Sequence, residues 1–205
     1  MIRLSILVPC WNQEVLVVKA LDSIPRRDDI EVIARDDGST DSTFAVLLEY
    51  QERHKDLNLT VLHEAANHGC AYNCNRLLEH CHGKYFHFLA NDDYLLTDEY
   101  LRVMGHLGEA DEILLNLRIN DGTVFRLNTD THRLFCAQST RFIRTAIAKG
   151  VEFPEHITGP SDWFFNEALE KRKPTKVFTG ITAYHYNFPR DGSLSDLIAK
   201  GVIKG

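Results

Sequence analysis

The chain has 205 residues, of which 44 % are hydrophobic, 25 % charged and 10 % aromatic, and this composition excludes a disordered or collagen-like protein. Its formal net charge of −6 at pH 7 provides no global basic field that would attract nucleic acid or an anionic lipid surface. The sequence shows neither a signal peptide nor a membrane span of ~20 apolar residues, and its five cysteines are an odd number, so we expect a cytoplasmic protein with free thiols.

The first hundred residues alternate between strand and helix patterns. Short β-rich apolar runs predict strands at residues 4–9, 30–34, 59–62 and 85–89. Apolar residues at helical spacing predict helices between them at residues 14–24, 42–54 and 72–82. Strands that are separated by helix-length crossovers favour a parallel sheet with helices on both faces. We therefore predict a Rossmann-like α/β arrangement for this part of the chain.

The pattern changes beyond a helix predicted at residues 97–107. Asn120-Asp121-Gly122 stands between two apolar segments, residues 112–119 and 123–127, and is the strongest hairpin signal in the chain. Two further helices and a last strand are expected at residues 139–149, 161–171 and 177–186. Because the sequence has no repeat and no flexible linker, we predict one domain over residues 1–205, with a mostly parallel half (1–95) and a smaller antiparallel subregion (96–205).

Ligands of an open parallel sheet bind beyond the carboxyl ends of its strands. In this sequence those ends carry polar and acidic residues, at positions 9–12, 36–39, 67–69 and 91–93. The first strand is followed by neither G-x-G-x-x-G nor G-x-x-x-x-G-K-[ST]. A dinucleotide oxidoreductase and a P-loop phosphotransferase are therefore disfavoured.

Asp92 and Asp93 are adjacent carboxylates directly after an apolar strand. Two such charges repel each other unless they share a cation. An oxygen-rich site that also accepts phosphate oxygens suits Mg²⁺ or Mn²⁺. The alternative is that this segment is a turn that caps the next helix.

The hexapeptide Asp36–Asp41 has two interpretations of the same kind. Its last three residues are good helix caps, and Gly38 permits a tight turn, so structure alone explains most of it. Capping does not require two acids before the glycine. A carboxylate at this strand end can accept the imide N–H of a pyrimidine base.

Taken in chain order, these residues resemble the family 2 glycosyltransferases, which have the GT-A fold. Six motifs carry the resemblance over nearly the whole chain. They are Pro9-Cys10-Trp11-Asn12, Asp36-Asp37-Gly38-Ser39-Thr40-Asp41, Asn67-His68-Gly69 with Asn75, Gly83 to Asn91-Asp92-Asp93, Phe153-Pro154-Glu155 with Ser161-Asp162-Trp163, and Tyr184-His185-Tyr186-Asn187 with Gly192-Ser193-Leu194-Ser195.

The resemblance implies an inverting transfer of a sugar from a nucleotide diphosphate donor, a UDP-sugar, to a hydroxyl of a glycan or another acceptor. It also implies which residues border the nucleotide-sugar, with Asp37 accepting from the base and Asp92 holding the ribose or standing near the metal. The other members of this set are Pro9, Trp11, Asn12, Asn67, Gly69 and Asn75.

For the chemistry, the resemblance implies that Asp93 binds Mn²⁺ or Mg²⁺ and that Asp162 is the general base. We assign His185 to the metal as well, with Arg190 as a further candidate for the metal or the phosphates. Asp162 opens a predicted helix, whose dipole favours an ionised carboxylate; plain helix capping is the alternative for this residue. Trp163 is expected either to offer an apolar face to an acceptor sugar or to join Phe164 and Phe165 in the core.

The sequence departs from the family pattern at several positions. Ala90 replaces the first acid of D-x-D-D, Cys74 replaces an arginine, and Ser161 replaces the glutamate of a Glu-Asp pair. Arg190 stands where a histidine is sometimes seen. These departures keep open a non-catalytic nucleotide-sugar-binding or scaffold protein of the same fold.

Two other classes of protein are disfavoured by the sequence. A sugar nucleotidyltransferase would need a glycine-rich, arginine-containing loop after the first strand, and residues 8–12 lack it. A zinc-binding module would use Cys70, Cys74, Cys81 and His82, but these residues include no C-x-x-C pair and do not share one helix face. Packing of a helix is the simpler role for these cysteines.

Overall fold

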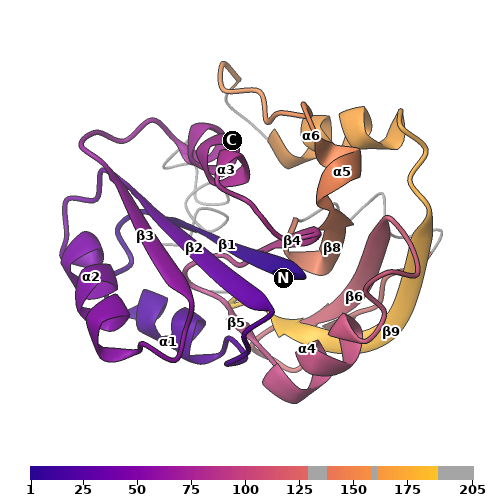
Figure 1. The fold of residues 1–205 in the computed structure, drawn as a ribbon, viewed down its shortest axis with the longest axis horizontal. Coiled ribbons are helices and arrows are strands. Elements are labelled where there is room, and N and C mark those ends of the chain that lie inside the picture. The colour runs from indigo at the N-terminus through magenta and orange to yellow at the C-terminus, as the bar shows by residue number, and fades with distance from the viewer. Residues whose placement is uncertain (129–137, 158–160, 189–205) are drawn as a thin grey trace.

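The computed structural model describes residues 1–128, 138–157 and 161–188, and Figure 1 shows a curled sheet with helices on both faces. The first part of the chain alternates strictly between strand and helix. Its elements are β1 (Leu4–Cys10), α1 (Leu16–Asp22), β2 (Ile30–Asp37), α2 (Thr43–Arg53), β3 (Leu59–Glu64), α3 (Cys70–Glu79) and β4 (Tyr85–Phe88).

The remaining elements are shorter and less regular. They are β5 (Tyr94–Leu95), α4 (Thr97–Met104), β6 (Glu112–Arg118), β7 (Val124–Phe125), the 3₁₀ turn η1 (Gln138–Thr140), β8 (Arg141–Arg144), α5 (Thr145–Ala148), α6 (Ser161–Glu170) and β9 (Lys176–His185). The predicted hairpin is confirmed, because β6 and β7 pair antiparallel and Gly122 adopts a φ of 88° in the turn between them.

One sheet runs through the whole molecule in the order β3-β2-β1-β4-β8-β6-β9-β5, with β7 paired to β6. The strands β3, β2, β1 and β4 are mutually parallel. The antiparallel strand β8 then joins β4 to β6. The predicted parallel half and the second subregion are therefore parts of one continuous sheet.

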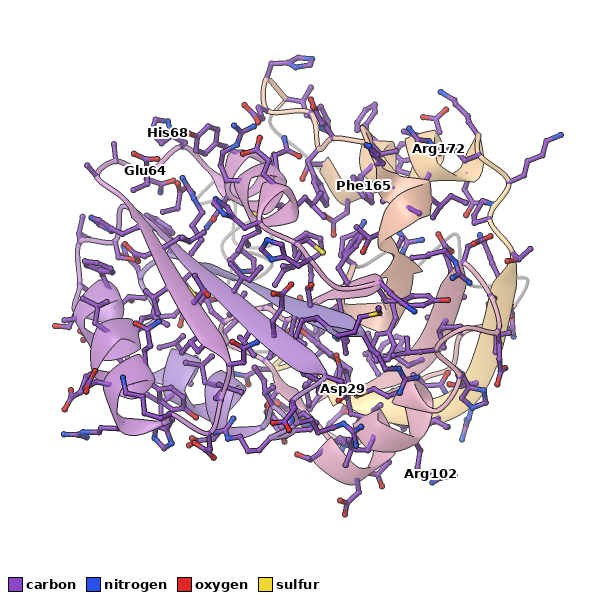
Figure 2. All side chains as sticks on the ribbon, viewed as in Figure 1. Asp29, Glu64, His68, Arg102, Phe165 and Arg172 are labelled. Carbon is purple, nitrogen blue, oxygen red and sulfur yellow. The ribbon has the colours of Figure 1, made fainter. Side chains whose placement is uncertain are left out.

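The sheet buries a hydrophobic core on each face because successive strand residues point to opposite sides. Ile6 packs in the core beneath α1, α2 and α4, whereas its neighbour Leu7 packs in the core beneath α3, α5 and α6. Figure 2 shows Phe165 pointing inward from α6, where it is fully buried, while Arg172 lies at the periphery.

The predicted helix over residues 139–149 is wrong in its first half, which forms η1 and β8. The physical reason is alternation: Phe142 faces one core and Ile143 the other, so this segment fits a strand that is buried on both faces. The helix predicted over residues 72–82 begins and ends earlier, at Cys70 and Glu79. Phe164 was expected in the core but is 45 % exposed beside Trp163, which is 61 % exposed.

Candidate active site

A cavity of about 510 Å³ lies where the carboxyl ends of β1 and β4 meet the start of α3 and α6. The segment after β9 and the turn η1 complete its wall. Four of the residues predicted from the sequence border this cavity, and they are Pro9, Asp92, Asp93 and Asp162. The cavity thus brings Asp92 and Asp93, which follow β4, together with Asp162 of α6, about 70 residues later in the chain.

The cavity is acidic on one side and apolar on the other. Its apolar wall comes from β4, the β6–β7 hairpin and the segment after β9, through Phe88, Phe125 and Phe188 among others. Within the part of the chain that the structure describes, no lysine, arginine or histidine lines it. A diphosphate would therefore need a cation to enter beside these carboxylates.

Asp93 is held firmly by residues from the other end of the chain. It is 2 % exposed, and its Oδ2 accepts a hydrogen bond from the Tyr184 hydroxyl at 2.6 Å. Its Oδ1 accepts one from the backbone N–H of Asn187 at 2.8 Å. The Tyr184 hydroxyl also accepts from the backbone N–H of Ala90 at 3.2 Å. Asp93 therefore anchors the end of β9 to the loop after β4.

Asp92 borders the same cavity but is only half-buried. The sequence assigned the metal mainly to Asp93, whereas the geometry makes Asp92 the more accessible of the two carboxylates. The described residues contain no group of three or more His, Cys, Asp or Glu side chains that could hold a metal by themselves. The pair fits Mg²⁺ or Mn²⁺, because such ions bind through one or two carboxylates and complete their shell with water and phosphate oxygens.

Asp162 stands in the first turn of α6 and faces the cavity. The helix dipole was expected to favour the ionised carboxylate, but burial raises the pKa of Asp162 above its ordinary value. The positive charge of Arg141 and a hydrogen bond from the backbone N–H of Gln138 both lower that pKa without cancelling the effect of burial. A carboxylate with a raised pKa is a better proton acceptor than an ordinary aspartate.

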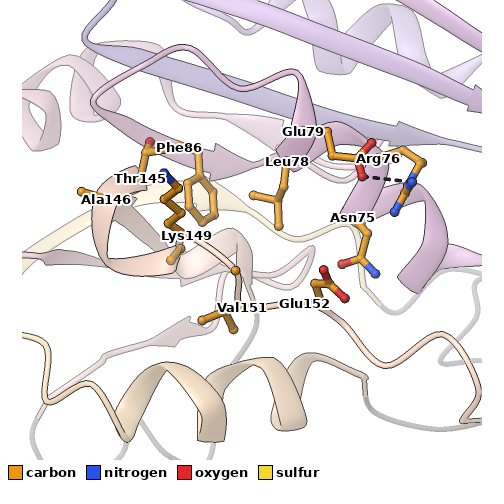
Figure 3. Close-up of a pocket in the computed structure, with 12 residues that line it drawn as sticks. Asn75, Arg76, Leu78, Glu79, Phe86, Thr145, Ala146, Lys149, Val151 and Glu152 are labelled. Atoms are coloured by element: carbon orange, nitrogen blue, oxygen red, sulfur yellow. Dashed lines mark ion pairs between the residues drawn. The ribbon is translucent and has the colours of Figure 1, made fainter.

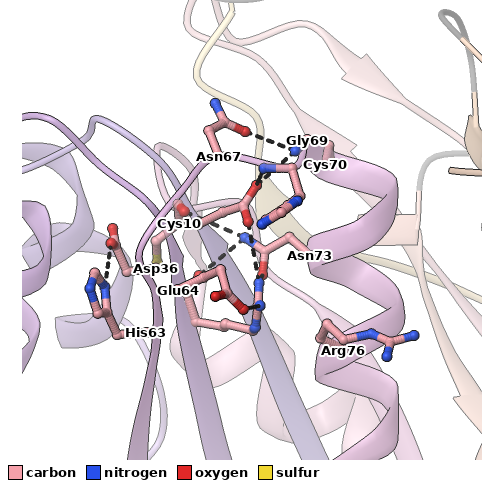
Figure 4. Close-up of polar contacts among 12 residues, drawn as sticks. Cys10, Asp36, His63, Glu64, Asn67, Gly69, Cys70, Asn73 and Arg76 are labelled. Carbon is pink, nitrogen blue, oxygen red and sulfur yellow. Dashed lines mark hydrogen bonds and ion pairs between the residues drawn. The ribbon is translucent and has the colours of Figure 1, made fainter. Parts of the chain in front are cut away.

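A second polar cluster lies at the ends of β1 and β2 (Figure 4). Asp37 is 2 % exposed, and its Oδ2 accepts from the backbone N–H groups of His68 at 3.0 Å and Gly69 at 2.8 Å. Arg35 donates to Asp37 Oδ1 at 3.4 Å and to Glu64 at 2.9 Å. Asp37 thus fixes the loop before α3, and both of its carboxylate oxygens accept hydrogen bonds within the protein.

Asn67 belongs to the same cluster. Its Oδ1 also accepts from the backbone N–H of Gly69, at 2.8 Å, and Gly69 has a φ of 93°. Asn73 of α3 completes the network through a donor bond to the carbonyl of Arg35 at 3.1 Å. The N-x-G segment is therefore held against the end of β2 by side chains from two elements.

Asn12 joins the loop after β1 to the loop after β2. Its Oδ1 accepts from the backbone N–H of Thr40 at 2.8 Å, and its own N–H donates to Ser39 Oγ at 2.9 Å. Asn12 is a non-glycine residue with a φ of 48°, a left-handed conformation that asparagine tolerates well. Trp11 beside it is 49 % exposed. These two loops form a rim next to the cavity.

The turn interpretation of the hexapeptide is supported for Gly38 and Asp41. A Cβ on Gly38 would lie 2.4 Å from the backbone of Ala66, and its φ is 65°. Asp41 accepts from the backbone N–H of Thr43 at 2.9 Å and of Glu14 at 3.2 Å. Gly38 and Asp41 therefore have a structural role in this loop, and contact with a ligand is left to the residues beside them.

Seven of the residues predicted from the sequence do not line the cavity. Five of them belong to the loops and the polar cluster described above (Trp11, Asn12, Asp37, Asn67 and Gly69), whereas Asn75 and His185 belong to neither. The side-chain amide of Asn75 is hydrogen-bonded to the segment after α5. Its Nδ2 donates to the backbone carbonyl of Phe153 at 2.9 Å, and its Oδ1 accepts from the backbone N–H of Phe153 at 2.8 Å. His185 stacks on Tyr94 at 4.2 Å and contacts Asn120 through Nε2 at 2.9 Å. Since Tyr184 points to Asp93, the next residue of the strand points to the opposite face. The assignment of His185 to the metal is therefore not supported.

Another cavity, of about 370 Å³, lies between α3 and the α5 region (Figure 3). Its wall includes Asn75, Lys149 and the Arg76–Glu79 ion pair, whose atoms are 2.9 Å apart. None of the three carboxylates of the first cavity lines it. Arg190 and the motif at residues 192–195 lie outside the described residues.

Sequence reasoning missed several residues that line the first cavity or hold its acids in place. Tyr184 and Asn187 belong to a motif that the sequence analysis quoted, but nothing local shows that they hold Asp93. Ser139 was expected at the start of a helix, and it instead forms a turn in the cavity wall together with Gln138. Cys70 and Cys74 were expected to pack a helix, and both line the cavity.

No helix among the described residues combines the length and the apolar character that crossing a membrane requires.

Residues 5–174 match the family model described as Glycosyl transferase family 2. The chain is 27 % identical over 211 residues to poly(ribitol-phosphate) beta-glucosyltransferase of Bacillus spizizenii, across 93 % of this chain and 33 % of that protein. It is 24 % identical over 212 residues to poly(ribitol-phosphate) beta-N-acetylglucosaminyltransferase TarS of Staphylococcus aureus, across 94 % and 36 %. The chain thus spans about a third of the length of these relatives.

Solved structures share the fold at low sequence identity. Staphylococcus aureus TarS 1–349 in complex with UDP-GlcNAc matches with a TM-score of 0.78 and 22 % identity, over 94 % of this chain and 60 % of that chain. A mannosyltransferase from Pyrobaculum calidifontis in complex with GDP-Man and Mn²⁺ matches with a TM-score of 0.73 and 19 % identity, over 99 % and 65 %. The expected GT-A fold is confirmed by these matches and by the curled α/β sheet.

Proposed function

The chain belongs to glycosyl transferase family 2, and we propose that it transfers a sugar from a UDP-sugar to an acceptor hydroxyl, with inversion and with the help of Mn²⁺ or Mg²⁺. The observation that carries this proposal is the cavity that brings Asp92, Asp93 and Asp162 together beside an apolar wall. An inverting transfer needs a base on one side of the anomeric carbon and charge stabilisation at the leaving diphosphate on the other. Asp162 would supply the base, and Asp92 with Asp93 would hold the cation that stabilises the diphosphate.

We place the nucleoside of the donor at the rim formed by Trp11, Asn12 and Asp37, as the family resemblance implies. Asp37 would accept the N–H of uracil at Oδ1, which accepts one bond of 3.4 Å from Arg35, since its Oδ2 already accepts two backbone N–H groups. The exposed ring of Trp11 would cover a face of the nucleoside. Support for a UDP-sugar comes from TarS, which has been solved in complex with UDP-GlcNAc.

Asp92 is the first ligand that we propose for the cation, with Asp93 as its neighbour. When bound, the cation would act as a Lewis acid on the diphosphate. Asp92 suits this role because it is half-buried and borders the cavity. Asp93 suits a second role, in which it holds the end of β9 in place through Tyr184 and Asn187.

Asp162 is the residue that we propose as general base. Its carboxylate would take the proton of the acceptor hydroxyl as the oxygen bonds to the anomeric carbon. The backbone N–H of Gln138 orients this carboxylate. Because the base acts in its ionised form, burial that raises the pKa of Asp162 makes proton removal more favourable at neutral pH.

The acceptor would approach along α6, where Trp163 and Phe164 are exposed directly after Asp162. Exposed aromatic rings beside a base offer an apolar face to a carbohydrate or polyol. The two curated relatives that match over most of the chain are named for poly(ribitol-phosphate). We therefore propose a polyol-phosphate or glycan chain as the acceptor class, with poly(ribitol-phosphate) as the first acceptor to test.

Thermal unfolding with nucleoside diphosphates and their sugars, each with and without Mn²⁺, tests the donor site. A ligand at 100 times its dissociation constant stabilises the folded state by about 2.7 kcal/mol. We expect a Mn²⁺-dependent shift with UDP that is lost in Asp92→Ala and kept in Asp162→Asn. Asp28→Asn, an exposed carboxylate away from the cavity, is the control and should keep the shift.

Transfer is measured separately, as release of UDP in the presence of acceptor. Binding of UDP without any release would assign the chain to the alternative, a non-catalytic nucleotide-sugar-binding protein, which Ala90 and Ser161 keep open. No shift with any nucleotide and metal would contradict both functions.

A further inference from the structure

One face of α6 is buried against the rest of the protein, and a polar residue lies in it. Phe165 and Leu169 are fully buried, and Phe165 stacks on Phe153 with ring centroids 4.2 Å apart. Asn166 lies on the same stripe and is 3 % exposed. Residues four apart are neighbours on a helix surface, so Asp162 lies one turn before Asn166 on this face. A buried asparagine needs hydrogen-bond partners.

Gln138 of the turn η1 is such a partner, and it contacts α6 at two successive turns. Its side-chain Nε2 donates to Asn166 Oδ1 at 2.9 Å. Its backbone N–H donates to the carboxylate of Asp162. Gln138 is 5 % exposed and lines the cavity together with Asp162. One residue therefore ties the first two turns of α6, and with them the Asp162 carboxylate, to η1.

The amide of Gln138 is only partly satisfied by its surroundings. Its Oε1 is buried, and no residue among those that the structure describes donates a hydrogen bond to it. A buried acceptor without a donor destabilises the folded state, whereas an apolar side chain of similar shape avoids this penalty. The stability of the fold therefore does not by itself account for an amide at this position.

The two ends of α6 are held by different polar contacts. At its last residue, Glu170 forms an ion pair with Lys176 of β9. At its first turns, the directional contacts are those of Gln138. The apolar contacts between them are non-directional, so they hold the helix against the core without setting the direction of the Asp162 side chain. That direction matters, because a misplacement of about 1 Å can reduce the rate of a reaction about 10²-fold.

We propose that Gln138 is a positioning residue for the transfer, which holds α6 through Asn166 so that the Asp162 carboxylate faces the acceptor hydroxyl. This inference rests on the proposed function, because it takes Asp162 as the general base. The tie between η1 and α6 rests on the contact between the two amides alone. In this role Gln138 acts through Asp162 and takes no part in bond making or proton transfer.

Gln138→Met tests the proposal, because methionine has a similar length but cannot donate to Asn166. Transfer is followed as release of UDP from UDP-GlcNAc with Mn²⁺ and poly(ribitol-phosphate) as acceptor. We expect kcat to fall about 10- to 100-fold, while the KM for UDP-GlcNAc and the UDP-dependent thermal shift stay unchanged. Gln51→Met is the matched control, since Gln51 Nε2 also donates one hydrogen bond, to the Leu59 carbonyl at 2.7 Å, but lies outside the cavity. Its kcat should equal that of the wild type.

The pH profile of transfer separates positioning from a general loss of structure. The backbone N–H of Gln138 lowers the pKa of Asp162, so weakening this bond should raise that pKa. The acid limb of the profile should therefore move to higher pH in Gln138→Met and stay in place in Gln51→Met. The titratable and charged side chains around Asp162 are Arg141 of β8, Cys70 and Cys74 of α3, and Asp92 and Asp93 after β4. The variant alters none of them.

Hydrogen exchange of peptides that cover α6 tests the tie independently of the reaction. Gln138→Met and Asn166→Leu should each speed exchange at the start of α6, and the double variant should exchange no faster than the faster single variant, because both changes remove the same bond. Unchanged exchange in Gln138→Met, or its full kcat where Asp162→Asn has lost transfer, would overturn the positioning role and leave the proposed function intact. Full transfer in Asp162→Asn would instead contradict the general base of the proposed function.

Discussion

Acid should destabilise this protein through a single buried histidine, His87 of β4. The side chain is fully buried, with Nε2 at 2.8 Å from the Ser139 carbonyl and Nδ1 at 2.8 Å from the Tyr100 hydroxyl. A carbonyl oxygen only accepts, so Nε2 carries the proton and Nδ1 accepts from the tyrosine. The neutral ring is fully paired, and burial lowers the pKa of His87 to about 4.

The magnitude follows from the difference between this pKa and the ordinary value of 6.5. Each pKa unit corresponds to 1.36 kcal/mol, so the gap corresponds to about 3 kcal/mol of unfolding free energy. Below pH 6.5 the His87 side chain binds a proton in the unfolded chain but stays neutral in the folded protein. The free energy of unfolding should therefore be unaffected by this group above pH 6.5 and should fall as the pH drops from about 6.5 to about 4.

Urea unfolding at a series of pH values measures this loss. His87→Gln can keep one donor and one acceptor but does not titrate, so its free energy of unfolding should fall by about 3 kcal/mol less than that of the wild type over the same interval. His156→Gln, at an exposed position, is the matched control and should follow the wild type. Identical pH dependence in wild type and His87→Gln would refute the reasoning.

Three further predictions concern the site and its frame. Tyr184→Phe removes the hydrogen bond to the Asp93 carboxylate and should cost about 1.5–3 kcal/mol in urea unfolding, and an unchanged midpoint would contradict the anchoring role of Asp93. Gly38→Ala should destabilise more than Gly69→Ala in the same assay, because both have a positive φ but only Gly38 would place a Cβ within 2.4 Å of backbone. Asp162→Asn should lower the rate of transfer by about 10²–10⁴-fold while UDP binding persists. In the wild type, transfer should fall as the pH drops through the raised pKa of Asp162, and a rate that is flat down to the ordinary range of aspartate would argue against this base.

Apart from the two-residue strand β5, which was not predicted, the strands and helices before residue 105 were predicted to within a few residues because their signals are local. Apolar periodicity sets each element, and Gly38 and Gly83 mark places where an element has ended. The later segment at residues 139–149 misled the same reasoning. Arg141-Phe142-Ile143-Arg144 becomes a strand only because the edges of β4 and β6 are open to pair with it, and those partners are far away in the sequence.

The candidate site was predicted where the polar ends of parallel strands meet, and Pro9 near the end of β1 lines one cavity with Asp92 and Asp93 after β4. Asp162 joins them from the first turn of α6, and the roles of these residues stay predictions. The sequence could not predict which groups surround each of these carboxylates. Asp93 receives its partners from Tyr184 and Asn187, more than ninety residues later. Likewise, the dipole of α6 is a local feature, while the burial that raises the pKa of Asp162 depends on packing.

The adjacent carboxylates of Asp92 and Asp93 therefore differ in the groups that surround them and in the role that we assign to each. Asp93 accepts hydrogen bonds from a tyrosine hydroxyl and a backbone N–H. These donors stabilise a carboxylate at that position whether or not a cation is present. Asp92 is half-buried and lines the cavity. Because β9 carries Tyr184 and the chain then continues along the cavity wall through Tyr186 and Phe188, Asp93 links the loop after β4 to the apolar face opposite the acids. The loss of an acid at Ala90 is consistent with this division, since its backbone N–H is tied to the same tyrosine hydroxyl, so the loop keeps its shape without a carboxylate there.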